Sequence, residues 1–350
     1  MCHSVQMITK DYKCYVFLLL AGLYCAGAYA VSEEQLANGF AAKLTDYMRT
    51  QGQRGQFHTP DNHIISYQRF DKHCNDVAVI VVPGWSEPYL KYAEVIHDLR
   101  QYNYCVYTYD HRGQGLSSRR LTNTQIGHVD DFDSYVADLQ QFDKQIVRSR
   151  RHRKVYILAH SMGGLIAVYY AAKTKQTIDG LILSAPMLKI KTGFWPEKVA
   201  YAIVSIMDWL GLGEHYVLGQ GNWQVTPFAD NRITHSRIRY EMNIDLLSHQ
   251  PALIVAGISN RWLKTSLEHT WRLAALMPTI RQRILLFQTS QDQFVINSAE
   301  DDFCSHVTSC KKIIYKNAKH ELLMESDSIR DDVFRRLVRF INSERRLSKQ

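Results

Sequence analysis

The sequence predicts an α/β protein, with a mostly parallel sheet flanked by helices and a helical lid inserted into it. Short apolar runs alternate with helical patterns from residue 77 to residue 183, as in right-handed strand–helix–strand units. The alternation resumes at residue 284, after about a hundred residues of helical character. The composition, 46% hydrophobic and 22% charged over 350 residues, excludes a disordered or low-complexity chain.

The elements of the first alternating part, and those before it, follow from local patterns. Residues 33–48 have helical periodicity, and the turn residues Pro60 to Asn62 within the stretch 56–67 indicate a hairpin. The continuous apolar run at 77–82 is typical of a strand buried on both faces. Further helices are expected at 90–99, 132–147 and 164–172, and further strands at 105–109, 155–159 and 178–183.

The region between the two alternating parts holds five of the six tryptophans and few strand signals. We interpret residues 187–271 as a helical lid, and residues 31–186 and 272–350 as the core into which it is inserted. The end of the core is expected to contain strands at 284–288 and 313–315 and a helix at 327–341.

Residues 1–30 have the pattern of a secretory signal peptide. Lys10 and Lys13 precede an uncharged stretch that ends in Ala28-Tyr29-Ala30, a small-x-small cleavage pattern. The uncharged run from Cys14 to Ser32 is 19 residues long, so an uncleaved membrane anchor is the alternative. Both interpretations predict an exported chain, either periplasmic or secreted.

Four of the seven cysteines lie beyond this leader. Cys304 and Cys310 could close a small disulfide loop in an oxidising compartment. Cys105 lies in a predicted strand, where a buried thiol is expected. His306 lies between Cys304 and Cys310, but the spacing matches none of the usual zinc-ligand pairs, so we expect no metal site.

The strongest chemical signal is Ala159-His-Ser161-Met-Gly163-Gly164, which follows one predicted strand and opens the next helix. Small residues two positions before and after Ser161 suit the tight strand-to-helix turn that exposes a nucleophilic hydroxyl. The backbone N–H of Met162 lies at the positive end of that helix, where it can stabilise an oxyanion.

A serine hydroxyl needs a base, and the base in turn needs an orienting acid. His320 directly follows the predicted strand 313–315, and Asp292 directly follows the strand 284–288. This gives the order serine, aspartate, histidine that is typical of such sites. The competing acids lie inside the next predicted helix and are expected on its surface: Glu300, Asp301 and Asp302.

The loop after the first parallel strand is expected to supply a second oxyanion donor. In Pro83-Gly84-Trp85-Ser86-Glu87 the candidate is the backbone N–H of Trp85, and Gly84 allows close approach of the backbone. The stretch Asp110–Ser117 follows the next strand and is expected to be a structural turn in which Asp110 and Arg112 brace loops.

Apolar residues recur at helical spacing within residues 194–212 of the lid: Trp195, Val199, Ile203, Ile206, Met207 and Leu210. We favour a helix packed on the core, with contact to an acyl chain or a bilayer as the alternative.

The cationic cluster Arg148–Lys154 lies at the C-terminal end of a predicted helix, where cations favour the helix dipole. We therefore expect a solvated turn and no nucleic-acid partner. The formal charge of +8, which becomes +7 when the leader is removed, suits an anionic lipid surface.

Over about residues 75–350 the chain resembles serine α/β-hydrolases of the monoacylglycerol lipase and lysophospholipase group, and within it bacterial lysophospholipases of the L-two type. The stretches that carry the resemblance are Pro83–Tyr92, Asp110–Ser117, Gly127–Val129, Ile157–Gly164, Ser184–Met187, Thr234–Arg237 and Ala318–Glu321.

The resemblance implies the α/β-hydrolase fold and hydrolysis of a fatty-acyl ester through an acyl-enzyme on Ser161, with no cofactor. It implies Asp292 and His320 as the other triad members, and Trp85 and Met162 as backbone oxyanion donors. The chain departs from the family pattern in three ways: Pro83 replaces the common histidine, Trp85 is bulky enough to narrow an acyl pocket, and the leader is unexpected for this bacterial type.

We expect a lysophospholipase, with a monoacylglycerol lipase or a lipid acyltransferase as alternatives within the same chemistry. A non-catalytic lipid-binding protein on the same fold is the alternative from another class. Arg237, and beside it Arg239, could meet a phosphate headgroup. Peripheral membrane contact through the lid is a further expectation, and the oligomeric state is left open.

Overall fold

An eight-stranded sheet forms the centre of the structure, a computed structural model that describes residues 30–343. The predicted signal peptide lies outside the described residues, apart from Ala30. In spatial order the strands are β1 (Gln53–His58), β2 (Ile64–Phe70), β4 (Cys105–Tyr109), β3 (Val77–Val82), β6 (Lys154–His160), β7 (Gly180–Ser184), β9 (Arg283–Thr289) and β10 (Cys310–Tyr315). The pairs β1–β2 and β2–β4 are antiparallel, and all the other pairs are parallel.

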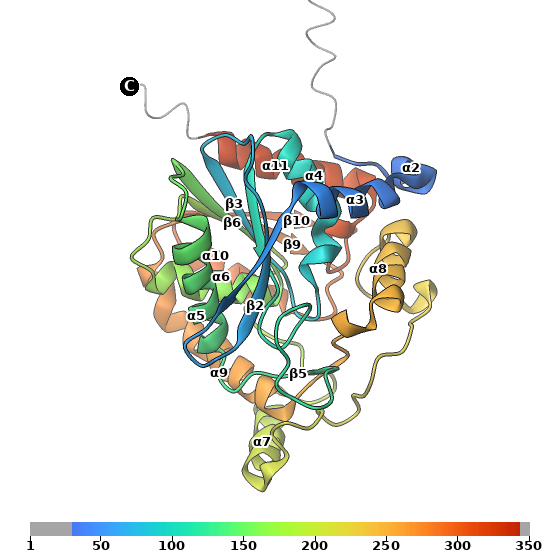
Figure 1. Cartoon of the computed structure of the whole chain (residues 1–350). Coiled ribbons are helices and arrows are strands. Elements are labelled where there is room, and N and C mark those ends of the chain that lie inside the picture. Colours follow the sequence, from blue (N-terminus) through green and yellow to red (C-terminus); the bar gives the residue numbers. More distant parts are fainter. Residues whose placement is uncertain (1–29, 344–350) are drawn as a thin grey trace, which may run out of the picture. The chain divides into compact units, whose positions relative to one another are not determined.

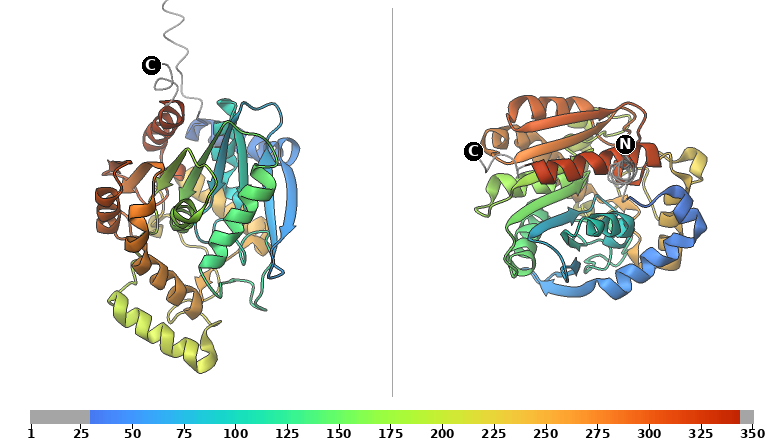
Figure 2. Two further views of the ribbon diagram at one scale, coloured as in Figure 1. Left: turned by 90° about the vertical axis from the view of Figure 1, so that its left-hand side faces the viewer. Right: turned by 90° about the horizontal axis from the view of Figure 1, so that it is seen from above.

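Helices cover both faces of this sheet (Figures 1 and 2). They are α2 (Glu33–Gln35), α3 (Ala41–Gln51), α4 (Ala93–Gln101), α5 (Asp133–Phe142), α6 (Met162–Lys173), α7 (Glu197–Met207), α8 (Arg237–His249), α9 (Asn260–Leu276), α10 (Asn297–His306) and α11 (Asp327–Asn342). Shorter helical turns lie at Leu36–Phe40, Tyr89–Tyr92, Asp143–Val147, Asp208–Leu212, Phe228–Asp230, Pro251–Leu253, Met277–Thr279 and Leu322–Met324. This arrangement confirms the predicted fold class.

The core has one apolar layer on each side of the sheet, and strand alternation explains why. Ala78, Ile80 and Val82 of β3 pack in the layer that contains side chains of α5, α6 and α9. Val79 and Val81 point the other way, into the layer built with α3, α4 and α11. A fully apolar run such as β3 is what a strand covered on both faces requires.

The predicted helix over 33–48 is interrupted, which corrects that expectation. Asn38 and Gly39 leave the helical region, and Gly39 has φ +87°, a conformation that glycine adopts without a steric penalty. The apolar spacing on both sides of Gly39 continues in register, so the periodicity alone does not reveal the break.

Both pairs of cysteines beyond the leader form disulfides. Cys304 is joined to Cys310, as the sequence allowed. Cys105 is joined to Cys74, so the expectation of a free buried thiol at Cys105 is wrong. Cys74 lies in the loop between β2 and β3, and β4 pairs with both of these strands, which brings the two cysteines together.

Most of residues 187–271 forms an irregular layer that contains α7 and α8. The two-residue strands β5 (Ile126–Gly127) and β8 (Gly257–Ile258) pair with each other and join this layer to a loop of the core. The described residues from Val31 onward nevertheless cluster as one compact unit. Figure 1 shows α7 at the lower end of this unit.

α7 packs on the core, as the sequence favoured, but through another face than the predicted stripe. Its buried residues are Ala200 and Val204, and on this side Tyr201 contacts Trp271 of α9. The predicted stripe is largely on the outside: Trp195, Val199, Ile206 and Leu210 are exposed, next to Phe194 at 94% and Trp209 at 83% exposure. The helix has apolar residues on both faces, and spacing cannot tell which face meets the core.

Candidate active site

Ser161 lies in a strained turn between the end of β6 and the start of α6. Its φ and ψ are 48° and −117°, a region that residues with a side chain rarely adopt. A Cβ at Gly163 would lie 2.3 Å from the carbonyl oxygen of Pro83, and one at Gly164 would lie 2.6 Å from Cβ of Pro186. The two glycines therefore let the turn approach the neighbouring loops and project the hydroxyl from the sheet edge.

The structure brings Ser161, His320 and Asp292 into one hydrogen-bonded row. Nε2 of His320 lies 2.9 Å from Oγ of Ser161, and Nδ1 of His320 lies 2.6 Å from Oδ2 of Asp292. The three residues follow β6, β10 and β9. Their proximity arises because the carboxyl ends of parallel strands share one edge of the sheet.

Asp292 is held as a carboxylate. Its Oδ1 accepts hydrogen bonds from the N–H groups of Phe294 and Val295, at 2.8 and 2.9 Å. Burial acts to raise the pKa of Asp292, but the hydrogen bond and charge of His320 and these two N–H groups outweigh it, so the pKa is lowered. An ionised Asp292 can fix the tautomer of His320 and stabilise the imidazolium that forms when His320 takes a proton.

The backbone N–H groups of the two predicted oxyanion donors are not used in hydrogen bonds within the described part of the chain. The backbone N–H groups of Trp85 and Met162 donate to no acceptor within residues 30–343. The residues on either side of Trp85 are fixed, because Gly84 N–H donates to Oε2 of Glu87 and Ser86 N–H donates to Oε1 of Gln114, each at 2.7 Å. Ser86 also has a positive φ of 60°.

A cavity of about 330 Å³ opens beside Ser161, His320 and Trp85. Its wall is largely apolar and combines the core with the layer 187–271: Met187, Ile190, Ile258, Trp262, Phe294 and Val295. The indole of Trp85 lies 6.2 Å from that of Trp262, between ring centroids, so both rings occupy one end of the chamber. An apolar chamber next to a nucleophile suits an acyl chain.

The structure does not bring the predicted headgroup residues to this cavity. Arg237 is exposed, pairs with Glu241 and lies over the ring of Phe228, and it is absent from the described residues that line the chamber. Arg239 is buried, and its donors are taken by Glu94, Asp327 and backbone oxygens. Neither arginine therefore lines the cavity beside Ser161.

One competing acid also differs from its expectation. Glu300 is buried on α10, not on the helix surface, and neither carboxylate oxygen has a hydrogen-bond partner. Burial raises the pKa of Glu300 to about 8, and the nearby Asp292 and Asp301 act in the same direction. At neutral pH this side chain is therefore largely protonated, unlike Asp292.

Sequence reasoning missed a buried charged group directly behind the triad. The ammonium of Lys91 bonds to Glu87, at 2.6 Å, and to Glu321, the residue next to His320. Oε2 of Glu87 accepts from Tyr92 Oη at 2.6 Å as well as from Gly84. No local pattern marks these residues, although Glu87 and Lys91 are four apart on one short turn, as partners on a helix would be.

Burial opposes charge on Lys91, but its two carboxylate partners more than compensate, so the pKa of Lys91 is raised and it stays cationic. Burial also acts to raise the pKa of Glu87, and here Lys91 and His160 outweigh it and lower that pKa. Glu87, Glu321 and His160 lie close enough to hold a metal ion, but the ammonium of Lys91 already binds both carboxylates.

Comparisons with known proteins agree with this geometry. Residues 73–327 match the hydrolase family described as serine aminopeptidase S33. The chain is 33% identical over 324 residues to Lysophospholipase L2 of Escherichia coli K12, with 88% of this chain and 94% of that protein covered. It is also 25% identical over 259 residues to the monoglyceride lipase of Homo sapiens, and the match covers 73% of this chain and 79% of the human protein.

Two solved structures share the fold at low sequence identity. A soluble variant of the monoglyceride lipase of Saccharomyces cerevisiae, in complex with a substrate analogue, has a TM-score of 0.65 at 17% identity and covers 84% of this chain and 97% of its own. A thermostable carboxyl esterase of Bacillus coagulans has a TM-score of 0.67 at 17% identity, and the match covers 84% of this chain and 99% of the esterase. These likenesses confirm the α/β-hydrolase fold.

Proposed function

The chain belongs to the serine aminopeptidase S33 family of α/β-hydrolases, and from this premise we propose that it is a lysophospholipase, a serine hydrolase that releases the fatty acid of a lysophospholipid. The observation that carries the proposal is the row Ser161–His320–Asp292 at the wall of an apolar cavity. The 33% identity to Lysophospholipase L2 over most of both chains supports the substrate class.

In the proposed reaction, Oγ of Ser161 attacks the ester carbonyl while His320 Nε2 takes the hydroxyl proton. The N–H groups of Trp85 and Met162 stabilise the oxyanion. His320 then gives its proton to the glycerol oxygen as the acyl bond to it breaks. Water, deprotonated by His320, attacks the acyl-enzyme, and His320 returns this proton to Oγ of Ser161 as the acyl–oxygen bond breaks, which releases the fatty acid and restores Ser161.

The apolar cavity supports an acyl substrate better than a polar one. Met187, Ile190, Ile258 and Phe294 offer no charge to a bound chain, while the reacting ester would lie at Ser161. The non-catalytic alternative, a lipid-binding protein, does not account for a buried aspartate aligned behind His320.

We also infer that the exposed apolar residues on the segments that flank α7 meet the lipid surface on which such substrates are found. Phe194, Trp209 and Leu210 project apolar side chains from one end of the protein, and aromatic and aliphatic groups of this kind partition into a bilayer interface. The formal charge of +8 favours an anionic surface. Among residues 30–343, no helix is long and apolar enough to cross a bilayer.

Export remains part of the proposal. The leader pattern ending at Ala30 predicts it, and the disulfides Cys74–Cys105 and Cys304–Cys310 support it, because such bonds persist in oxidising compartments.

Side-by-side assays test the substrate class. Product release is measured from lysophosphatidylcholine, lysophosphatidylethanolamine and monoacylglycerol, and we expect the lysophospholipids to react faster. Faster monoacylglycerol turnover would instead favour the monoglyceride lipase activity named for the human relative.

Labelling by a fluorophosphonate tests the nucleophile. We expect the wild type to be labelled, and Ser161→Ala to lose both labelling and about 10⁴-fold or more of its activity. An unlabelled wild type would favour a lipid-binding role without catalysis.

A further inference from the structure

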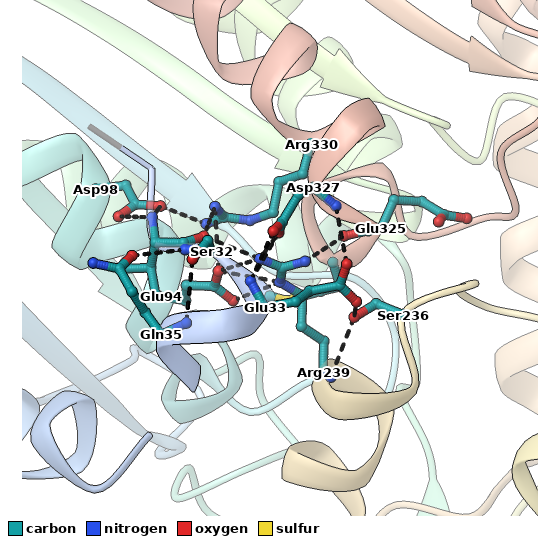
Figure 3. A network of polar contacts seen from close by, with 12 residues as sticks. Ser32, Glu33, Gln35, Glu94, Asp98, Ser236, Arg239, Glu325, Asp327 and Arg330 are labelled. Atoms are coloured by element: carbon teal, nitrogen blue, oxygen red, sulfur yellow. Dashed lines mark hydrogen bonds and ion pairs between the residues drawn. The ribbon is translucent and has the colours of Figure 1, made fainter. Parts of the chain in front are cut away.

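The segment that follows the predicted cleavage site lies in a cluster of charged residues (Figure 3). Val31 is 3% exposed and packs with Leu36 and Leu44. Its backbone nitrogen lies 3.1 and 3.3 Å from the two carboxylate oxygens of Asp98, a side chain with no solvent exposure. A chain end that docks this way is unusual, because the first residues of a domain are commonly poorly ordered.

The cluster around Val31 contains more negative than positive charge. It comprises four carboxylates, on Glu33, Glu94, Asp98 and Asp327, and two guanidinium groups, on Arg239 and Arg330. Nδ1 of His97 lies 3.2 Å from Asp98. Glu94 and Asp98 are buried and pair with the buried Arg239 and Arg330, whereas Glu33 and Asp327 are partly exposed. A cation at the backbone nitrogen of Val31 would give the buried Asp98 a second charged partner beside Arg330.

Cleavage at the predicted site would create a cation at this nitrogen. We propose that hydrolysis of the Ala30–Val31 peptide bond by a signal-peptidase-type protease leaves the α-ammonium of Val31 as a buried ion-pair partner of Asp98. Water supplies the second carboxylate oxygen of Ala30, and the released amine of Val31 takes up a proton. In the precursor the same nitrogen is an amide with a single hydrogen, whereas the ammonium has three donors and a full charge.

This ion pair would fasten the mature chain end to three separate elements. Asp98 lies on α4, and the carbonyl of Val31 accepts from Arg239 of α8 and from Arg330 of α11. The backbone N–H of Glu33 donates to both oxygens of Asp327. The carboxylate of Glu33 accepts from the hydroxyl of Ser236, which caps α8.

These contacts of Val31 and Glu33 are connected to the candidate active site through the segment before α8. The carbonyl of Ile233, a residue that lines the cavity, accepts from the N–H of Glu321 at 2.8 Å, next to His320. Removal of the leader during export would therefore add the last contact that holds the segment before α8 in place. The inference does not require the proposed lysophospholipase reaction, since it concerns the chain end and its charge.

The first test is the amino-terminal residue of the protein expressed as the full chain with its leader. We expect amino-terminal sequencing and intact mass to give a chain that begins at Val31. A mature chain that begins at any other residue, or retains the leader, overturns the proposal.

The second test separates the charge from the cleavage. One serine inserted between Ala30 and Val31 keeps the Ala28-x-Ala30 site, and cleavage then leaves the ammonium one residue, about 3.8 Å, ahead of Val31. We expect this insertion to lower the thermal midpoint by about 5 °C or more in the wild type. In an Asp98→Asn background the same insertion should have little further effect, and equal effects in both backgrounds overturn the proposal.

If Asp98→Asn does not fold, the chemical reactivity of the Val31 amino group tests the ion pair without that variant. A buried, paired ammonium should react with an amine-directed acylating reagent at least about tenfold more slowly in the native wild type than in the serine-insertion protein. After denaturation the two chain ends should react at the same rate. Equal rates in the native proteins would show that the ammonium is not held by Asp98.

Discussion

The imidazole rings of His160 and His320 lie against each other, with their centroids 4.7 Å apart. Nδ1 of His160 lies 3.1 Å from the carbonyl oxygen of Ser184, and Phe294 covers His320 on another side at 4.9 Å. The row Ser161–His320–Asp292 is therefore supported by packing, and the group that packs on it is itself titratable.

Acid should destabilise the protein through His160. Burial lowers the pKa of His160 to about 4, and the positive charges of His320 and Lys91 act in the same direction against Glu87. An unfolded chain binds this proton near pH 6.5, so the stabilisation from neutral His160 is present above that pH and is lost as pH falls toward 4. We expect His160→Gln to reduce the fall in thermal midpoint between pH 7 and pH 5.

The matched control for this prediction is His249→Gln, because His249 is exposed. Its fall in thermal midpoint between pH 7 and pH 5 should equal that of the wild type. An unchanged fall in His160→Gln would contradict the role given to burial.

Replacing Glu87 should impair turnover more than substrate binding. Glu87→Gln cannot accept from Gly84, Tyr92 and Lys91 together, so the loop that carries Trp85 loses its anchor. We expect kcat to fall by about tenfold or more with a small change in KM, because the oxyanion donor is displaced and the acyl cavity is kept.

The control is Glu241→Gln, which changes an exposed ion pair and should leave both kcat and KM near the wild-type values.

The turn at Ser161 should tolerate no side chain at position 163. In Gly163→Ala the new Cβ meets the backbone oxygens of Pro83 and Val82 at 2.3 and 2.5 Å, so either the elbow or the oxyanion loop must move. A shift of about 1 Å costs on the order of 10²-fold in rate. Gly221→Ala is the control, because a Cβ there meets nothing within 4 Å. Equal activity of the two variants would refute the packing argument.

The sequence predicted the elements that local rules specify. Ser161 could be proposed from the sequence because a tight turn needs small neighbours, and His320 and Asp292 could be proposed because parallel strands align their ends. The group of Glu87, Lys91 and Glu321 was missed because burial of charges depends on contacts 230 residues apart. The face of α7 was misjudged for a related reason: an apolar stripe has the same spacing whether it meets the core, a lipid or water.

The exposed apolar residues that flank α7 should matter only on aggregated substrates. We expect Phe194→Ser combined with Trp209→Ser to weaken binding to anionic phospholipid vesicles by about tenfold or more, because two large apolar side chains no longer leave water. Hydrolysis of a short soluble ester should stay near wild type. Ile314→Ser, which changes an exposed apolar residue of β10, is the control, and comparable losses there would argue against a defined lipid-binding face.

Glu300 gives the opposite pH dependence from His160. Because its pKa is about 8 in the folded protein and near 4.5 in an unfolded chain, the folded state retains the proton longer. The stabilisation from protonated Glu300 is therefore complete below about pH 4.5 and is lost progressively as pH rises to 8. Glu300→Gln has the shape of the protonated glutamate but cannot ionise, so its contribution to stability does not change with pH. We expect its thermal midpoint to exceed that of the wild type by several degrees at pH 8 and to match it near pH 4.5. Glu214→Gln, at a partly exposed ion pair with Arg120, should give no such divergence, and a Glu300→Gln difference that is constant with pH would mean that Glu300 is already ionised in the fold.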